Sequence, residues 1–442
     1  MRVRRELWGA GFGMVMGAIV SGCTGSGPAP TPTAEARPTE QQAREALREA
    51  TQRDREKYAG MTFEEFKASD AVYREPFEGG KFIVDGDTTI VDEKQLRAFF
   101  ENKVQKAPPP PLPPGVTALI VHRVNGLDAA WNNETKRSLT YCVSRSGFGA
   151  RYDVVVRDMG LAGDAWSGAA DVDFVHVAAE DDSCTASNGA VVFDVRAVDV
   201  GGEYLARAFF PNEPRHTRNV LIDQTALSIG PGEKPQLVGI LRHELGHALG
   251  FRHEHTRPSA GRCFEDTDWG VLTEYDPYSV MHYPQCNGRG DWSLTLTDRD
   301  RSGGACLYGE AEGFTMDETL VQMENCRTEL PPPTVGTPRT ESFAGQSVAL
   351  DAQKVHGPFD VLPGSLLTAT MGGSSATGDP DLYVRFGNPA SLVAYDCRPF
   401  LWGPAETCAV NVPADQTRAH VMVHGYAAGR YDLKVEYTAP GN

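Results

Sequence analysis

The stretch HELGHALGFRHE, residues 243–254, decides how this chain folds. Apolar residues recur before and within it at helical spacing, so one face of a short helix can pack on a core: Leu237, Ile240, Leu241, Leu245, Ala248 and Leu249. Pro235 suits a first helical position, and Gly250 suits the residue just past the helix end. We therefore expect a helix that stops at a glycine turn.

Three histidines in this stretch have the spacing of metal ligands. His243 and His247 are four residues apart, so both imidazoles project from one helical face. Gly250 can take the left-handed conformation that ends a helix, which lets the chain reverse and bring His253 to the same ion. Three neutral imidazoles with one open position describe a catalytic zinc site. Glu244 lies beside them, placed to act on a water at the metal as general base.

An H-E-x-x-H pattern alone also fits an ordinary helix with two surface histidines and a solvated glutamate. The additional G-x-x-H disfavours that alternative, because the full pattern is the metzincin signature, which is followed by a methionine turn. Residues 279–283, SVMHY, supply such a turn. The two segments resemble the astacin branch of the metzincins, and are most similar to the astacin-like dual-action HEIGH metallopeptidases of myxobacteria.

The resemblance implies a zinc metalloendopeptidase of peptide or protein substrates, with an α+β fold. The expected fold is a metzincin (zincin-like) catalytic domain with a mixed sheet and a zinc helix. In this chain we expect it to be joined to a C-terminal all-β sandwich. Met281 would form a soft floor beneath the zinc. Tyr283 would be a weak fifth ligand that swings away to hydrogen-bond the developing oxyanion. Glu254 would anchor the new N-terminus after maturation, with a solvated loop glutamate as the alternative.

The whole chain of 442 residues is long enough for several domains, and 40% of it is hydrophobic. We predict a lipoprotein signal peptide (1–23), a tether and pro-segment with a Pro-rich linker (24–114), and an astacin-like peptidase domain (115–310). A linker (311–338) and a C-terminal pre-peptidase β-sandwich (339–442) follow. The net charge of −17 argues against nucleic-acid binding. The oligomeric state does not follow from the sequence.

The first segment indicates export. A basic start precedes the apolar run Leu7 to Val20, which is too short for a mature membrane helix. It ends in VSGC, residues 20–23, which resembles a bacterial lipobox, so we expect Cys23 to carry lipid and to be the only membrane attachment. Ordinary signal-peptidase cleavage is the alternative. The protein would then be an outer-membrane or cell-surface lipoprotein, released if maturation cuts near the Pro108–Pro114 spacer.

Residues 34–106 are interpreted as a pro-segment. Helical runs are expected over Glu40–Glu56 and Glu93–Lys106, with a short strand-like piece, FIVDGD, at residues 82–87. Astacin pro-segments place an aspartate of an F-x-G-D motif in the open zinc position, and residues 84–87, VDGD, are similar only in the G-D. Asp87 as latency ligand is therefore one hypothesis. A turn aspartate after glycine is the other.

Strand-like segments precede the zinc helix: Thr117–Val124, Ser138–Val143, Val172–Val177, Ala190–Val195, Ala206–Phe210 and Val220–Asp223. A helix is expected over Tyr152–Trp166. Ala206–Phe210 ends at a proline and suits an edge strand, which in the astacin-like fold binds extended substrate. His255 competes with His253 as third ligand, but the spacing favours His253. His122, His176, His216 and His282 lack ligand spacing and are interpreted as structural.

Nine cysteines become eight once Cys23 is set aside, an even number that suits an oxidising compartment. Cys397 and Cys408 are the firmest predicted pair. Pairing Cys263 with Cys286 would brace the site, which leaves Cys142, Cys184, Cys306 and Cys326 with connectivity that the sequence does not determine.

Residues 339–438 alternate short apolar pieces with Gly, Pro, Asn and Asp, as in a small β-sandwich. They resemble a bacterial pre-peptidase C-terminal domain. Asp379 and Asp381 offer carboxylates to a calcium ion, but a turn followed by a strand start explains them without metal, and we favour that. A different overall function would be a surface-anchored binding protein with the zinc domain as scaffold. Glu244 and Tyr283 argue against it, because a scaffold needs neither.

Overall fold

The catalytic body is organised on a five-stranded mixed sheet. Its order is β7 (Phe174–His176), β6 (Leu139–Val143), β8 (Phe193–Val198), β10 (Asn219–Asp223) and β9 (Ala206–Arg207). The first four strands are parallel, and β9 runs antiparallel to β10. The expectation of a mixed sheet is confirmed, and the segment beginning at Ala206 is an edge strand as predicted.

The computed structural model describes residues 57–77, 79–84, 87–105, 119–124, 127–230, 232–256, 269–283, 288–326, 336–392, 394–413 and 416–441. Several predictions on the export signal, Cys23, the Glu40–Glu56 helix, the Pro108–Pro114 spacer and the Cys263–Cys286 pair lie outside these residues. Within the described ranges, no helix combines the length and apolar character that crossing a membrane requires.

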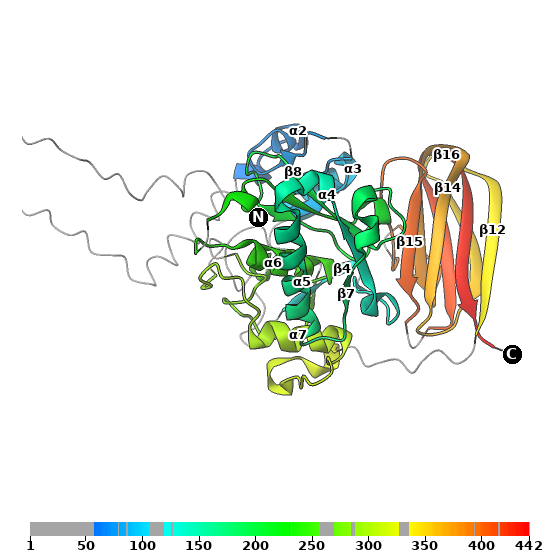
Figure 1. Ribbon diagram of the computed structural model, residues 1–442. Helices are drawn as coiled ribbons and strands as arrows, with labels where there is room; N and C mark the ends of the chain where they lie inside the picture. The colour runs from blue at the N-terminus through cyan, green and yellow to red at the C-terminus, as the bar shows by residue number, and fades with distance from the viewer. Residues whose placement is uncertain are drawn as a thin grey trace, which may run out of the picture.

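Two helices, α5 (Tyr152–Ser167) and α6 (Leu237–Ala248), pack on one another beside this sheet (Figure 1). The apolar face of α5 is buried, and the indole of Trp166 donates to the carbonyl of Arg242 at 2.9 Å. Every residue of α6 from Ile240 to Leu241 and from His243 to Ala248 is buried. A helix that carries polar ligands inside a core needs such support, because burial of polar groups is costly unless they are paired.

The end of α6 forms a complete Schellman motif. The amide of Phe251 donates to the carbonyl of Gly246 at 2.9 Å, and that of Gly250 to His247 at 2.8 Å. Gly250 has φ +96°, and a Cβ there would lie 2.2 Å from the carbonyl oxygen of Ala129. The glycine stop is therefore confirmed. The start differs from expectation, because extended Gln236 (φ −80°, ψ 155°) makes Leu237 rather than Pro235 the first helical residue.

A second small sheet holds the turn after α6. It has the order β11 (Trp269–Val271), β4 (Ile120–Val124) and β5 (Leu127–Asp128). The amide of His122 donates to the carbonyl of Gly250 at 2.7 Å, and the amide of Arg252 donates to the carbonyl of Ile120 at 2.9 Å.

Helix α7 (Asp298–Tyr308) starts with a capping box between Thr297 and Asp300. The shorter elements are α4 (Arg145–Phe148), η3 (Thr135–Arg137), η4 (Gly149–Arg151), η5 (Ala178–Ser183), η6 (Arg215–Thr217), η7 (Ala226–Ser228), η8 (Glu254–Thr256), η10 (Glu318–Leu320) and η11 (Met323–Asn325).

The N-terminal segment, which the sequence predicts to be a pro-segment, has a small core of its own. It contains α2 (Phe63–Lys67), the antiparallel strands β1 (Tyr73–Arg74), β2 (Phe82–Val84) and β3 (Thr88–Ile90), α3 (Glu93–Phe99) and the π-helical turn η2 (Phe100–Val104). Buried Phe66, Leu96 and Phe100 are among the side chains that meet in this core. The predicted helix after residue 93 is confirmed, with a change of helix type at Phe100.

The C-terminal domain is all-β, as predicted. Its strands are β12 (Thr337–Val348), β13 (Gln353–Asp360), β14 (Leu366–Phe386), β15 (Glu406–Asn411) and β16 (Arg418–Ala439), and they stand side by side at one end of the molecule (Figure 1). The long strands β14 and β16 pair along their length with register shifts between Gly372 and Pro380. Bulges of this kind bend a strand.

The segment after α7 differs from the predicted linker. Val321 is buried in the catalytic core and forms a bridge with Thr273, and Cys326 is joined to Cys306. Residues 311–326 therefore pack on the catalytic body. The reason is that a disulfide and a few apolar contacts hold a segment whose composition is otherwise polar.

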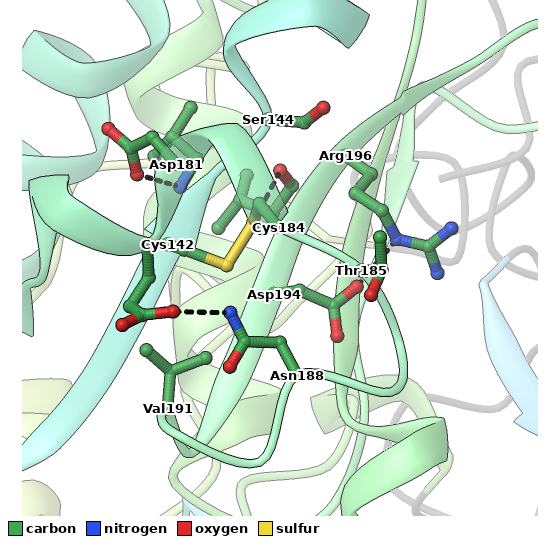
Figure 2. The surroundings of a disulfide bond; sticks show 12 residues. Cys142, Ser144, Asp181, Cys184, Thr185, Asn188, Val191, Asp194 and Arg196 are labelled. Atoms are coloured by element: carbon green, nitrogen blue, oxygen red, sulfur yellow. Dashed lines mark hydrogen bonds and ion pairs between the residues drawn. A yellow bond between two sulfur atoms is a disulfide. The ribbon is translucent and has the colours of Figure 1, made fainter.

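Three disulfides lie within the described residues: Cys142–Cys184, Cys306–Cys326 and Cys397–Cys408. The predicted Cys397–Cys408 pair is confirmed, and the connectivity that the sequence left open is resolved. Figure 2 shows Cys142 of β6 joined to Cys184, which follows η5. The carboxylate of Asp181 accepts the amide of Val143 at 2.8 Å in the same corner, so the loop is fixed to the sheet twice.

We predict that Gly250→Ala destabilises the protein and lowers zinc binding. A left-handed alanine costs about 1–2 kcal/mol, before the clash with Ala129 is counted. Gly160→Ala on α5 is the matched control, because nothing lies within 4 Å of a Cβ there. Denaturant unfolding and zinc titration of both variants measure the difference. Equal stability and equal zinc affinity for the two variants would contradict the role given to this turn.

Candidate metal centre

Three imidazoles converge on one point inside the catalytic body. His243 and His247 come from successive turns of α6, and His253 is returned by the glycine turn. The Nε2 atom of His253 lies 3.1 Å from that of His247 and 3.2 Å from that of His243. All three side chains are buried. The structure thus brings together the three histidines that the spacing singled out.

The opposite ring nitrogens orient two of these imidazoles. Nδ1 of His243 contacts the carbonyl of Val280 at 2.7 Å, and Nδ1 of His247 contacts that of Phe251 at 2.8 Å. A carbonyl only accepts, so each Nδ1 carries the proton and each Nε2 presents a lone pair. Burial lowers the pKa of His243 and lowers the pKa of His247 well below its usual value. The rings are therefore neutral, as metal ligands are.

These lone pairs fit a zinc ion. The single Nε2 proton that His253 could offer satisfies at most one of the two facing lone pairs, so a shared cation explains the convergence better than hydrogen bonds do. Ligand nitrogens at about 2.0–2.1 Å from tetrahedral zinc lie roughly 3.3 Å from one another. The Nε2 separations of 3.1 and 3.2 Å are close to that value.

Asp87 of the predicted pro-segment completes a group of four. Its carboxylate oxygens lie 2.9 Å from Nε2 of His253, 3.5 Å from that of His243 and 3.8 Å from that of His247. All four ligand atoms lie within 4.8 Å of one another. Burial raises the pKa of Asp87, but its interactions with His253 and His243 outweigh this effect and hold the pKa well below the usual range. Asp87 lies in a turn, as the turn-aspartate hypothesis stated. Its carboxylate also contacts the imidazoles, as the latency-ligand hypothesis required.

Tyr283 contacts this group directly, and Met281 lies against α6. The hydroxyl of Tyr283 donates to the Asp87 carboxylate, and its ring centroid lies 4.5 Å from that of His253. Met281 is fully buried beneath α6, where a Cβ on Gly246 would come within 2.3 Å of its sulfur. Only a glycine at position 246 allows this approach.

Asp300 supports the methionine turn, and the sequence analysis missed it. Its carboxylate accepts the hydroxyl of Ser279 at 2.5 Å and the amide of Val280 at 2.8 Å. Burial raises the pKa of Asp300 to about 6. The carbonyl of Val280 orients His243, so Asp300 acts on the centre through this turn. An aspartate three residues after Thr297, in a capping pattern, was the available signal.

Glu244 is fully buried on the face of α6 beside the imidazoles. Within the part of the chain that the structure describes, neither of its carboxylate oxygens has a hydrogen-bond partner. Burial, followed by the charge of Asp87, raises the pKa of Glu244 to about 8. A buried carboxyl without partners is costly, and such groups are commonly kept for chemistry.

The remaining candidates lie outside the group of four. His255 is buried and stacks on His253 with ring centroids 4.5 Å apart, but it offers no ligand atom to the cluster. Glu254 is 0% exposed, so its interpretation as a solvated loop residue is wrong. His176 contacts Asp181 at 3.0 Å, and His122 stacks on Phe210. His282 is paired with the hydroxyl of Tyr275 at 2.7 Å.

Two buried ion pairs attach the predicted pro-segment to the catalytic body near Asp87, and no sequence pattern predicts either pair. Glu75 accepts two hydrogen bonds from Arg207 of β9, at 2.7 and 2.9 Å, and one from Tyr204 at 2.6 Å. Lys81 donates to Glu213 at 2.6 Å. Burial opposes ionisation of Glu75, but Arg207 and the hydrogen bonds hold its pKa below the usual value. Each pair joins residues more than a hundred positions apart, so no local pattern indicates it.

Comparisons with known proteins agree with a metal-dependent peptidase. Residues 130–260 match the matrixin family of peptidases. The chain is 29% identical over 120 residues to the zinc metalloprotease of Helicobacter pylori, which covers 27% of this chain and 45% of that protein. These two findings support a metzincin-type zinc metallopeptidase.

Other similarities are shorter. The chain is 50% identical over 68 residues to the alkaline serine exoprotease A of Vibrio alginolyticus, 15% of this chain and 12% of that protein. It is 38% identical over 69 residues to the neutral protease of Vibrio proteolyticus, 16% of this chain and 11% of that protein. A serine protease shares no zinc chemistry, so the first similarity does not bear on the metal centre. The chain spans less than half the length of each of these relatives.

We predict that His253→Ala abolishes stoichiometric zinc binding, whereas His255→Ala retains about one zinc per chain. Both residues are buried histidines two positions apart, but only His253 has its Nε2 in the cluster. Elemental analysis of the purified variants after dialysis, with circular dichroism as a folding control, measures this. Loss of zinc from His255→Ala with retention in His253→Ala would reverse the ligand assignment.

Proposed function

We propose that this chain is the latent precursor of an astacin-like zinc endopeptidase that cleaves peptide bonds. The observation that carries the proposal is the convergence of His243, His247 and His253 with Asp87, next to a buried, unpaired Glu244. The three histidines would hold the zinc, and the Asp87 carboxylate would be its fourth ligand in the precursor. This arrangement has one replaceable ligand, as a catalytic zinc site requires.

When bound, zinc polarises the scissile carbonyl and makes a nucleophile available from water at neutral pH. Glu244 accepts the proton of the attacking water and returns it to the leaving amine. Tyr283 donates its hydroxyl proton in a hydrogen bond to the oxyanion, and a hydrogen-bond donor in this role contributes about 3–4 kcal/mol. Its place in the precursor, hydrogen-bonded to Asp87, is within reach of the same centre.

Latency follows from what the pro-segment occupies. Asp87 takes the fourth position and also engages Tyr283, so one carboxylate blocks two catalytic groups. Thr88 and Thr89 line the same small cavity as Phe209, Phe210 and His247, beside the sheet edge where substrate is proposed to bind. The pro-segment therefore excludes an extended peptide from that edge. Glu75 anchors the pro-segment through a buried ion pair with Arg207, and Lys81 through one with Glu213.

Maturation by proteolysis removes this segment in our proposal. Cleavage near the Pro-rich linker would detach Asp87 and the two ion pairs together. Glu254 is buried and its amide donates to the carbonyl of Met281 at 2.9 Å, so it lies in the interior next to the methionine turn. We propose that it pairs with the new N-terminus there. Export is part of the same proposal, because disulfides persist in oxidising compartments, and the lipid anchor at Cys23 remains a prediction.

We predict that Glu244→Ala in the matured enzyme lowers peptide hydrolysis by about 10²–10⁴-fold, because a general base is lost. Bound zinc should remain near one per chain, since Glu244 is not in the ligand cluster. Casein digestion with and without a chelator gives the activity, and Glu274→Ala, an exposed glutamate on the same body, is the control. Undiminished hydrolysis by Glu244→Ala would refute the mechanism.

We predict that Asp87→Ala gives an uncleaved chain with measurable activity, severalfold above the wild-type precursor. The fourth position opens and Tyr283 loses its partner, while both anchoring ion pairs stay intact. Thr89→Ala is the control, because it removes a neighbouring contact of 3.3 Å to Glu213 without opening the metal position. Fluorogenic peptide hydrolysis, with electrophoresis to exclude cleaved protein, is the measurement. An Asp87→Ala precursor no more active than wild type would count against the latency role.

A further inference from the structure

Lys94 belongs to pro-segment helix α3, but its ammonium lies inside the C-terminal domain. Nζ donates to Asp381 at 2.5 Å, to Asp379 at 3.2 Å and to the carbonyl of Leu401 at 3.2 Å. The side chain is 2% exposed. An ammonium group has three donors, and here each donor has one acceptor.

Aromatic rings surround the same ammonium. Nζ lies 4.2 Å from the ring centroid of Phe400, 4.3 Å from that of Tyr426 and 5.6 Å from that of Trp402. A cation within about 6 Å of such ring faces is attracted by their quadrupoles. We call this site the lysine pocket, and it consists of Asp379, Asp381, Leu401 and the three rings of Phe400, Trp402 and Tyr426.

The C-terminal domain builds the pocket from its own residues. Glu406 accepts the amides of Leu382 and Leu401, both at 2.6 Å, and Asp379 accepts the amide of Gly403 at 2.7 Å. The Cys397–Cys408 disulfide closes the loop that carries the rings of Phe400 and Trp402 onto β15, and Tyr426 belongs to β16. The walls are therefore held in place by contacts that do not involve the pro-segment.

The chemistry of the pocket selects a primary ammonium. Two carboxylates and one carbonyl, arranged around a single nitrogen, match a compact group with three donors better than a planar guanidinium with a fixed fork. Burial raises the pKa of Asp381 to about 6, and the hydrogen bond from Lys94 opposes that rise. Buried carboxylates left without a cation are costly, so a pocket vacated by Lys94 favours the binding of another cation.

The surroundings fit a polypeptide rather than a free amine. On the two sides of Lys94, Asp92 accepts the amide of Trp402 at 2.9 Å, and Gln95 donates to the carbonyl of Pro399 at 2.9 Å. Main-chain groups of the C-terminal domain at the pocket rim thus bind the side chains of residues that flank Lys94 in the sequence. Trp402 and Tyr426 are 56% and 42% exposed even in the precursor, so an aromatic surface extends from the pocket to solvent.

We propose that the lysine pocket is a binding site for an unmodified lysine side chain on a polypeptide. Lys94 fills it in the full chain, which ties the pro-segment to the C-terminal domain. When the pro-segment leaves, the pocket accepts a lysine of another protein. That last step rests on the proposed maturation, whereas the binding site itself is independent of catalysis. The site also accounts for Asp379 and Asp381 without the calcium ion that their spacing suggested.

The test uses the full-length Lys94→Ala variant, whose pocket is vacant. Isothermal titration with Nα-acetyl-lysine amide should show one binding site in this variant and none in the wild-type chain. Nα-acetyl-norleucine amide and the trimethyl-lysine analogue should bind at least tenfold more weakly, because they lack the donors that the acceptors require. Calcium chloride is titrated separately.

A second pair of variants assigns the binding to the pocket. Adding Asp381→Asn to Lys94→Ala should weaken lysine-amide binding about tenfold or more, because a charge-assisted hydrogen bond is lost. Adding Asp360→Asn, an exposed aspartate on β13, should leave it unchanged. A folded Lys94→Ala chain that binds the norleucine amide equally well, or binds calcium and not the lysine amide, overturns the proposal.

The wild-type chain provides the measurement if Lys94→Ala does not fold. Excess Nα-acetyl-lysine amide should compete with Lys94 and speed hydrogen exchange of the amides in α3, whereas the norleucine amide should not. Exchange rates in α2, whose Lys67 and Glu64 pair with Glu93 and Arg97 rather than with the pocket, provide the internal reference. Equal exchange in α3 with both amides would contradict competition for the pocket.

Discussion

One carboxylate facing three imidazoles is the interaction on which the rest of this structure depends. The imidazoles of His243, His247 and His253 can converge only if α6 is held rigidly and its end reverses within a few residues. The Schellman turn at Gly250 provides the reversal, and β4 holds that turn through hydrogen bonds to its backbone. Below the centre, Met281 approaches α6 where Gly246 leaves room for its sulfur. The geometry of the centre is thus a consequence of tertiary packing around a short helix.

The segment predicted to be a pro-segment is attached to both of the other domains by buried charges. Glu75 pairs with Arg207 at the sheet edge, Lys81 pairs with Glu213, and Lys94 pairs with two aspartates of the C-terminal domain. Buried pairs of this type add little net stability relative to apolar contacts, but losing one partner costs about 3–5 kcal/mol. They therefore specify where Asp87 lies more than they strengthen the fold.

The sequence was sufficient for features that depend on local spacing. The i, i+4 histidines, the glycine stop, the edge strand at Ala206 and the Cys397–Cys408 pair all follow from patterns within a few residues or one hairpin. It was insufficient where distant residues meet. Nothing near Asp300 indicated Ser279, nothing near Glu75 indicated Arg207, and the polar composition of residues 311–326 concealed a segment tied down by Cys326. Pro235 was misplaced because propensity for a first helical position does not fix where the backbone turns helical.

The most direct test of this account is a crystal structure of the zinc-loaded, uncleaved chain, with anomalous data at the zinc edge. The account predicts one zinc with Nε2 of His243, His247 and His253 and one oxygen of Asp87 as ligands, each at about 2.0–2.2 Å. A zinc whose fourth ligand is water, with the Asp87 carboxylate out of contact, would contradict it.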